Sequence, residues 1–223
     1  MPIEIDETTR RCTLIGEGLR IEGEGPDIEI ITDEQLRMSV AMTNSGNLGW
    51  VSDRSGYRYD PLDPDSGQPW PAMPPLLRQL AFDAAQAAGF PGFAPDACLI
   101  NRYAPGTRLS LHQDRDEGNY AHPIVSVSLG IPAVFLWGGA QRSDKARRIA
   151  LMHGDVVVWG GPARLRFHGV LPLPEAHHPM TGSYRINLTF RRIVVEQQGG
   201  GGSDVECINS GVSGCANSIP GGA

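Results

Sequence analysis

The chain has 223 residues, of which 40% are hydrophobic and 20% are charged, a balance that is ordinary for a soluble globular domain. The formal net charge of −6 disfavours a protein coated in phosphate-binding surface, because that affinity comes from Lys and Arg. No apolar run approaches the ~18 residues of a membrane span and no secretory signal pattern opens the chain, so we expect a cytoplasmic protein without membrane contact.

The N-terminal third reads as short strands and turns. The chain contains 28 glycines and 18 prolines, and residues 1–35 alternate apolar with acidic residues between glycines. Residues 32–36 could open a short helix, with Thr32 or Asp33 as its N-cap.

A segment rich in Gly, Pro, Asp and aromatic residues follows, over residues 42–75. Its aromatic rings, at Trp50, Tyr57, Tyr59 and Trp70, have two interpretations. They could form an exposed surface on which a nucleobase stacks, since every base offers a π-face, or they could be packing residues. Composition alone favours packing.

Residues 76–88 form the clearest helix. Apolar residues recur near i, i+4 and i+8 spacing, two prolines precede them, and Gly89 can end the helix. We expect this helix to be structural, with its apolar face against a sheet.

Eight short strand-like runs then succeed one another, separated by Pro, Gly, Asp and Asn turns. They predict a mainly β (α+β) fold with a double-stranded β-helix, or jelly-roll, core and few supporting helices. The runs cover residues 98–103, 109–113, 124–129, 133–137, 148–152, 155–159, 165–170 and 184–191.

We expect three parts in this chain. Residues 1–90 would form an N-terminal extension with a lid and the supporting helix, and residues 91–195 would form the jelly-roll core. Residues 196–223 begin a Gly/Ser-rich stretch without periodicity, which predicts a flexible tail.

The four cysteines show no close C-x-x-C pair, so no zinc ribbon or redox motif is indicated. Cys98 lies in an apolar run and is predicted to be a small buried residue. Arginines cluster late in the chain, including Arg142, Arg148 and Arg164, and a solvated charged face is the simpler interpretation for any single one.

The chemistry of the chain is concentrated in residues 101–116. His112 and Asp114 are spaced i and i+2, which in a strand places both side chains on one face. His168 lies in a later apolar, strand-like run. Two imidazoles and one carboxylate are the ligand set of the facial triad that binds non-haem Fe(II) and leaves positions open for a co-substrate and O₂.

A strand near the end of the predicted core carries the matching polar face. Arg185, Asn187, Thr189 and Arg191 alternate with apolar residues and would share one side of that strand. A dicarboxylate between the two guanidiniums and the metal would relieve their mutual repulsion through bidentate hydrogen bonds. The pattern therefore favours a 2-oxoglutarate pocket.

Several long stretches resemble the AlkB family of Fe(II)/2-oxoglutarate-dependent dioxygenases. The resemblance runs from about residue 38 to residue 193, and the tail lies outside it. The stretches that carry it are Gly49-Trp50 and residues 69–74, 99–106, 109–114, 123–130, 153–161 and 185–191.

The resemblance implies a role for each matching residue. His112, Asp114 and His168 would hold the iron, and Asn101, Tyr103, Arg185, Asn187 and Arg191 would bind 2-oxoglutarate, with Arg185 on its distal carboxylate. The lid would be a nucleotide-recognition lid, in which Trp50 stacks on a flipped base and Asp116 meets the exocyclic amine of that base. Met42 and Tyr57 would touch the base or its phosphate, and Arg142 would lie at the mouth of the pocket.

The activity that this resemblance implies is direct reversal of alkylation damage. An enzyme using Fe(II), 2-oxoglutarate and O₂ would demethylate bases such as 1-methyladenine and 3-methylcytosine in single- or double-stranded DNA, with RNA left open, releasing formaldehyde, succinate and CO₂. Methylation at the pairing edge makes such a base cationic and cheaper to flip, so an aromatic sandwich and a carboxylate favour it over normal bases. We expect a monomer.

Two other functions are compatible with these residues. The oxygenase could act on a protein or a small molecule, or the jelly roll could bind a ligand without redox chemistry. His153 and Asp155 form a second H-x-D, which we interpret as a turn before a strand, and we interpret His122, His177 and His178 as turn or surface residues.

Overall fold

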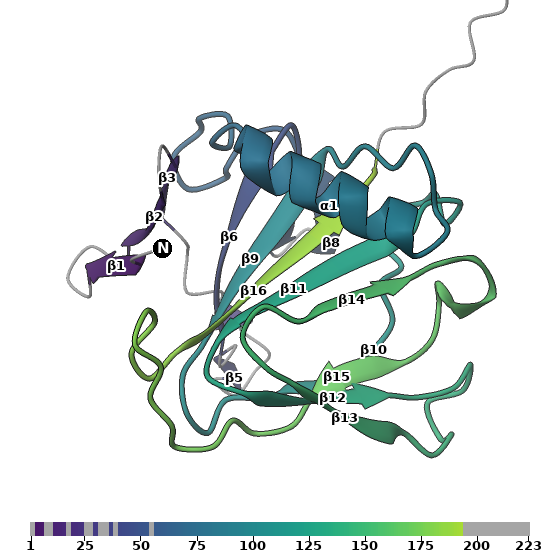
Figure 1. Ribbon diagram of the computed structural model, residues 1–223. Helices are drawn as coiled ribbons and strands as arrows, with labels where there is room; N and C mark the ends of the chain where they lie inside the picture. Colours follow the sequence, from purple (N-terminus) through teal and green to yellow (C-terminus); the bar gives the residue numbers. More distant parts are fainter. Residues whose placement is uncertain are drawn as a thin grey trace, which may run out of the picture.

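The computed structural model describes the backbone of five N-terminal strands and then residues 40–53 and 56–193 with their side chains (Figure 1). The N-terminal strands are β1 (Ile3–Asp6), β2 (Arg11–Gly16), β3 (Leu19–Glu24), β4 (Glu29–Ile30) and β5 (Leu36–Arg37). Strands β1, β2 and β3 form one antiparallel sheet in that order, and β4 pairs with β5.

A five-stranded antiparallel sheet forms the larger wall of the core. Its strand order is β14 (Val156–Trp159), β11 (Ile124–Gly130), β16 (Arg185–Arg191), β9 (Ala97–Tyr103) and β6 (Val40–Gly46). Helix α1 (Pro75–Ala87) lies across the outer face of this sheet (Figure 1). The strand that ends the core in sequence, β16, is thus its central strand.

A four-stranded antiparallel sheet forms the opposite wall. Its order is β10 (Leu109–His112), β15 (His168–Val170), β12 (Ala133–Trp137) and β13 (Arg147–Leu151). A short 3-10 turn, η1 (Gly161–Ala163), connects β14 to β15. The two sheets enclose a buried cluster that includes Tyr103, Phe135 and Val170.

Residue alternation on β16 separates packing from chemistry. Ile186, Leu188 and Phe190 pack toward α1 in the same buried cluster as Leu77 and Ala81 of the helix. The residues between them face the cavity between the sheets, because successive side chains of a strand point to opposite faces. Because the apolar residues of β16 pack against α1, the polar residues of the same strand must face the cavity.

The lid is a two-stranded hairpin of β7 (Gly49–Asp53) and β8 (Gly56–Asp60). Its base is fixed by Trp70, whose indole N–H donates to the Asp60 carbonyl at 2.9 Å. A Cβ on Gly49 would lie 2.3 Å from the Trp70 ring, so only glycine allows this close approach. Trp70 is a packing residue, whereas Tyr57 is 57% exposed.

The predicted fold is confirmed, since the described chain is mostly antiparallel β structure with α1 as its helix. Each of the eight predicted core runs corresponds to a strand, although the run over residues 165–170 forms a strand only from His168. Cys98 is buried, as predicted.

Two predictions concern residues that lie, wholly or mostly, outside those the structure describes. Residues 32–35 of the predicted short helix and the tail over residues 196–223 fall there, whereas Leu36, the last residue of that predicted helix, belongs to strand β5. The division at residues 90 and 195 stays a prediction, although β6 pairs with β9 of the core along its whole length. Within the described residues, no helix is long and apolar enough to cross a membrane.

Candidate active site

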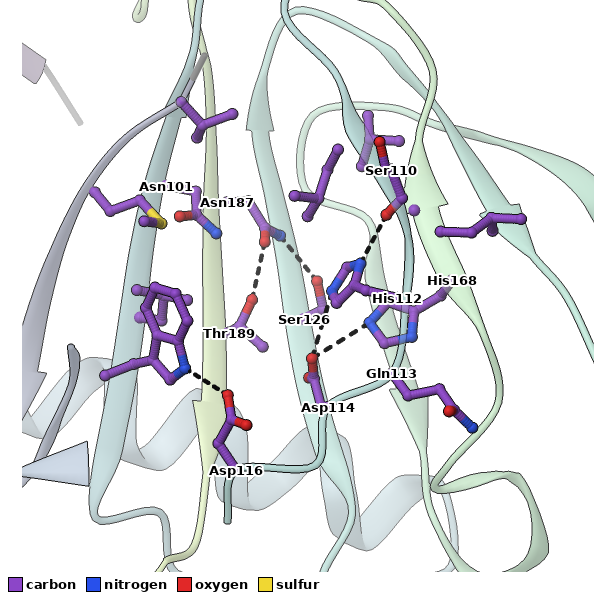
Figure 2. Close-up of a pocket in the computed structure, with 18 of the residues that line it drawn as sticks. Asn101, Ser110, His112, Gln113, Asp114, Asp116, Ser126, His168, Asn187 and Thr189 are labelled. Carbon is purple, nitrogen blue, oxygen red and sulfur yellow. Dashed lines mark hydrogen bonds and ion pairs between the residues drawn. The ribbon is translucent and has the colours of Figure 1, made fainter. Parts of the chain in front are cut away.

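The three residues predicted to bind iron lie together in the structure. The Nε2 atoms of His112 and His168 are 3.4 Å and 3.7 Å from Oδ1 of Asp114. One ligand atom from each residue lies within 4.8 Å of the other two, and Figure 2 shows the three side chains converging. Among the described residues this is the one His, Cys, Asp or Glu group with metal-ligand spacing.

Strand register brings the two histidines together. His112 ends β10 and is the Cα partner of His168, which begins β15, after a shift in register that follows Leu109. Asp114 lies in the loop after β10 rather than within a longer strand, which differs from the predicted run to residue 113. The carboxylate still reaches the imidazoles from that loop.

Backbone carbonyls fix both imidazole tautomers. Nδ1 of His112 lies 2.9 Å from the Ser110 carbonyl, and Nδ1 of His168 lies 3.0 Å from the Arg166 carbonyl. A carbonyl only accepts, so each Nδ1 carries the proton and each Nε2 presents a lone pair. Two neutral nitrogens and one carboxylate oxygen fit a divalent iron.

The charge of Asp114 is stabilised by Arg191. Nη2 and Nε of Arg191 donate to Oδ2 of Asp114 at 2.6 Å and 3.2 Å. Burial opposes ionisation of Asp114, but the Arg191 charge and the two histidines outweigh it and hold its pKa well below the ordinary value. Oδ1, on the other side of the carboxylate, faces the histidines.

The pKa values of the two histidines are shifted in opposite directions in the metal-free protein. Burial lowers the pKa of His168 to about 4, so this ring is neutral near pH 7. Burial also acts to lower the pKa of His112, but its hydrogen bond to Asp114 and the charge of that carboxylate raise the pKa above the ordinary value.

Arg185 is the residue best placed to receive a carboxylate. It is 2% exposed, its Nη2 donates to Ser128 Oγ at 2.9 Å, and Nε and Nη1 have no hydrogen-bond partner. Tyr103 lies directly opposite it on β9, with the guanidinium 5.0 Å from the centre of the tyrosine ring. A buried cation with free N–H groups is costly, which indicates an anionic ligand.

Other residues predicted to bind 2-oxoglutarate are held by the protein itself. The Asn187 amide donates to Ser126 Oγ and the Val127 carbonyl, and it accepts from Thr189 (Figure 2). Arg191 donates to the Asp114 carboxylate, as described above. Oδ1 of Asn101 is buried without a partner. Arg185 and Asn101 thus retain unused polar atoms, whereas the Asn187 amide is already hydrogen-bonded.

The lid closes the cavity from one side. The indole N–H of Trp50 donates to Oδ2 of Asp116 at 2.7 Å, and the Trp50 ring stacks on Tyr57 with centroids 5.4 Å apart. All thirteen predicted site residues line one cavity of about 670 Å³. Among them, Met42 comes from β6, Trp50 and Tyr57 from the lid, Asp116 from the loop after β10 and Arg142 from the loop between β12 and β13.

The structure adds a buried carboxylate that the sequence did not single out. Glu117 contacts Arg191 Nε at 2.9 Å, Arg164 Nη2 at 3.3 Å and the Tyr59 hydroxyl at 3.2 Å. Its sequence signal is slight, a second acid after Asp116. The prediction that the clustered arginines lie on a solvated face is wrong for Arg164, whose side chain is buried with 3% exposure. Its guanidinium also donates to the backbone carbonyls of Asp114 and His122.

The other histidines lie away from the triad, as predicted. His153 occupies the turn before β14, and its Nδ1 accepts from the Gly130 N–H at 2.9 Å. Its ring stacks on His178 with centroids 4.3 Å apart. The H-x-D at residues 153–155 is therefore a turn motif that anchors a neighbouring strand end.

Comparisons with known proteins agree with this geometry. The model of the 2OG-Fe(II) oxygenase superfamily matches residues 18–191. The alpha-ketoglutarate-dependent dioxygenase AlkB of Escherichia coli (strain K12) is 55% identical over 172 residues, which span 77% of this chain and 80% of that protein. The DNA N(6)-methyladenine demethylase ALKBH1D of Arabidopsis thaliana is 40% identical over 112 residues, which span 45% of this chain and 25% of that protein.

A solved structure has the same fold. The structure of OsALKBH1 superposes with a TM-score of 0.59 at 33% sequence identity, and the match covers 69% of this chain and 78% of that chain. The family model spans most of the residues here, and His112, Asp114 and His168 form a possible site for the iron that its name implies. The chain belongs to the 2OG-Fe(II) oxygenase superfamily, and within it to the AlkB dioxygenases.

Proposed function

We propose that this protein is an oxidative demethylase of N-alkylated nucleobases, such as 1-methyladenine and 3-methylcytosine. The observation that carries the proposal is one cavity into which the histidine and aspartate ligands, the free N–H groups of Arg185 and the aromatic lid all face. One relative is a DNA N(6)-methyladenine demethylase, which supports a nucleic-acid substrate.

His112, Asp114 and His168 would hold Fe(II) through two Nε2 atoms and one carboxylate oxygen. Arg185 would bind the distal carboxylate of 2-oxoglutarate, with Tyr103 and Asn101 beside it and with Asn187 orienting Ser126 and Thr189. Arg191 would lie near the metal-chelating end of 2-oxoglutarate, where it also donates to Oδ2 of Asp114. Bound together, Fe(II), 2-oxoglutarate and O₂ supply the oxidation of an N-methyl group, with succinate and CO₂ as products.

Recognition of the damaged base falls to the lid and to the loop after β10. A flipped cationic base would lie between the rings of Trp50 and His112, because aromatic faces attract cations. Asp116 would accept from the exocyclic amine of the base. Met42 and Tyr57 would contact the base or its phosphate, and Arg142 would contact the strand at the cavity mouth.

DNA is the proposed substrate, in single or double strands, and the proposal extends to RNA. We also propose that the enzyme acts as a monomer. Fe(II) must remain reduced between turnovers, which suits the cytoplasm.

A turnover assay tests the proposal. Protein loaded with Fe(II) and 2-oxoglutarate in air should release formaldehyde and succinate in equal amounts from a 1-methyladenine or 3-methylcytosine oligonucleotide, in single strands, in duplex and in RNA. Well-folded protein that binds iron and 2-oxoglutarate yet leaves every methylated oligonucleotide intact would point to the protein or small-molecule hydroxylase instead.

A further inference from the structure

We propose that Glu117 is a positioning residue that couples closure of the lid hairpin to the orientation of the iron-binding carboxylate of Asp114. Glu117 is only 6% exposed and lies in the loop after β10, three residues beyond Asp114. It contacts groups from three different parts of the fold. These are the Tyr59 hydroxyl on β8, the Arg191 guanidinium on β16 and the Arg164 guanidinium after η1.

One guanidinium joins Glu117 to the metal ligand. Nε of Arg191 lies 2.9 Å from Oε1 of Glu117 and 3.2 Å from Oδ2 of Asp114, while Nη2 lies 2.6 Å from the same Oδ2. The position of Arg191 therefore fixes which oxygen of Asp114 is held and which one, Oδ1, faces the histidines. Groups that orient a ligand in this way typically change metal affinity 10- to 100-fold when they are lost.

The charges in this cluster balance. Asp114 and Glu117 are two buried carboxylates, and Arg164 and Arg191 are two buried guanidiniums. Removing the charge of Glu117 would leave Asp114 as the carboxylate that attracts Arg191. The guanidinium would then move toward Asp114, the proposed iron ligand. Since loss of one partner of a buried charge pair is strongly destabilising, we expect this movement to change the orientation of Asp114 and so the affinity for iron.

The lid contacts this group of buried charges, and the acid next to it, through two neighbouring hydrogen-bond donors. Trp50 and Tyr59 are direct cross-strand partners on the hairpin, and they donate to two successive acids, Asp116 and Glu117. Burial holds the pKa of Tyr59 well above its ordinary value, so its hydroxyl stays a donor. The Trp50 contact is exposed and can open, whereas the Tyr59 contact is buried beside the charges that hold Asp114.

A coupling follows from this arrangement, and it rests on the proposed function because nucleic acid would close the lid. In the structure the Tyr59 hydroxyl already donates to Glu117, and an oligonucleotide bound on the lid would stabilise this contact and with it the hold of Arg191 on Asp114. Coupling of this kind is reciprocal. A bound oligonucleotide should strengthen iron binding, and bound iron should strengthen oligonucleotide binding by the same factor.

The test is an anaerobic Fe(II) titration of 2-oxoglutarate-saturated protein, followed by the charge-transfer absorption of the bound complex. It is run with and without a methylated oligonucleotide on the wild type, Glu117→Gln, Tyr59→Phe and Tyr120→Phe. Tyr120→Phe is the matched control, because it removes a tyrosine hydroxyl that donates to the Arg115 carbonyl rather than to Glu117, and it keeps the ring that lies against Arg164.

Glu117→Gln should weaken Fe(II) binding roughly 10- to 100-fold and shift the absorption band, with the melting temperature recorded to check folding. Tyr59→Phe should weaken Fe(II) binding less than Glu117→Gln does, and it should lose the strengthening by oligonucleotide, which Tyr120→Phe should keep. Tyr59→Phe tests the coupling even if Glu117→Gln does not fold. Wild-type affinity and spectrum in Glu117→Gln, or full strengthening in Tyr59→Phe, would overturn the proposal.

The oligonucleotide-free titration remains informative if no methylated base is demethylated. In that case the proposed substrate is wrong, while the effect of Glu117→Gln on iron binding still supports or refutes the positioning role.

Discussion

The indole N–H of Trp50 donates to Oδ2 of Asp116 at 2.7 Å, which ties the lid to the loop that carries the metal ligand Asp114. The two residues are 66 positions apart in sequence, and each is proposed to contact a damaged base. Trp50 thus has two separable features, an aromatic face for stacking and an N–H that holds the base-binding acid.

Substitution at Trp50 should separate these features. Trp50→Phe keeps an aromatic face and loses the hydrogen bond, and we expect KM for a methylated oligonucleotide to rise about fivefold, since an exposed hydrogen bond contributes about 1 kcal/mol. Trp50→Ala should raise KM further, because stacking on a base contributes about 1–3 kcal/mol. Oligonucleotide-independent consumption of 2-oxoglutarate should survive in both. Unchanged KM in Trp50→Ala would argue against stacking.

Substitutions in the two H-x-D motifs, at residues 112–114 and 153–155, should have opposite effects on iron binding. His112→Ala removes one Nε2 donor from the triad and should abolish turnover and Fe(II) binding at micromolar metal. His153→Ala removes the acceptor of the Gly130 N–H and the ring that stacks on His178, so it should cost about 1 kcal/mol or more in unfolding free energy and leave iron binding intact. Fe(II) titration and chemical denaturation of both variants measure this, and the reverse pattern would refute the ligand assignment.

Arg185 should determine the affinity for 2-oxoglutarate. Arg185→Lys keeps the charge but loses the planar fork, so KM for 2-oxoglutarate should rise roughly thirty-fold, or about 2 kcal/mol. Fe(II) binding alone should change little, because Arg185 does not contact the triad. Arg166→Lys is the matched control, since Arg166 is an exposed arginine over the Trp137 ring, and it should keep the wild-type KM. Equal effects of the two substitutions would remove Arg185 from the carboxylate site.

The metal-free protein should lose stability in acid partly through His168. Its pKa is about 4 when folded and near 6.5 when unfolded, so between these values the unfolded chain binds more protons. Its contribution to the unfolding free energy therefore falls as pH drops from 6.5 to about 4, by at most about 1.4 kcal/mol per pH unit. His112, whose pKa is raised, acts in the opposite direction.

Denaturation of metal-free wild type and His168→Gln at several pH values isolates this contribution. The difference in unfolding free energy between the two proteins should move in favour of His168→Gln as the pH is lowered through that window. A difference that stays constant with pH would mean that the ring binds protons equally in the folded and unfolded states, so that folding does not lower its pKa.

Much of the fold could be predicted because strand and helix periodicities are local. The alternation over Arg185–Arg191 placed Arg185, Asn187 and Thr189 on one face, and β16 bears this out. The close pairing of His112 with His168 needed the resemblance to a family, since it depends on the register between β10 and β15.

The role of Glu117 could not be predicted from its neighbours in sequence. Its partners Tyr59 and Arg164 lie on the lid and beyond η1, and the guanidinium that it shares with Asp114 lies 77 residues beyond that aspartate. Only the packing of the two sheets and the lid brings these groups together. The same packing buries Arg164, which composition had favoured as a surface residue.

The central claim is oxidative removal of a methyl group from a base, and isotopic labelling tests it most directly. A single-stranded oligonucleotide with one 1-methyladenine, labelled with carbon-13 in its N-methyl group, is incubated with protein, Fe(II), 2-oxoglutarate and O₂. We predict that the label appears in formaldehyde, that the base becomes adenine, and that one succinate forms for each label released. Succinate formation with the label still on the base, under every lesion and strand context tried, would contradict the account.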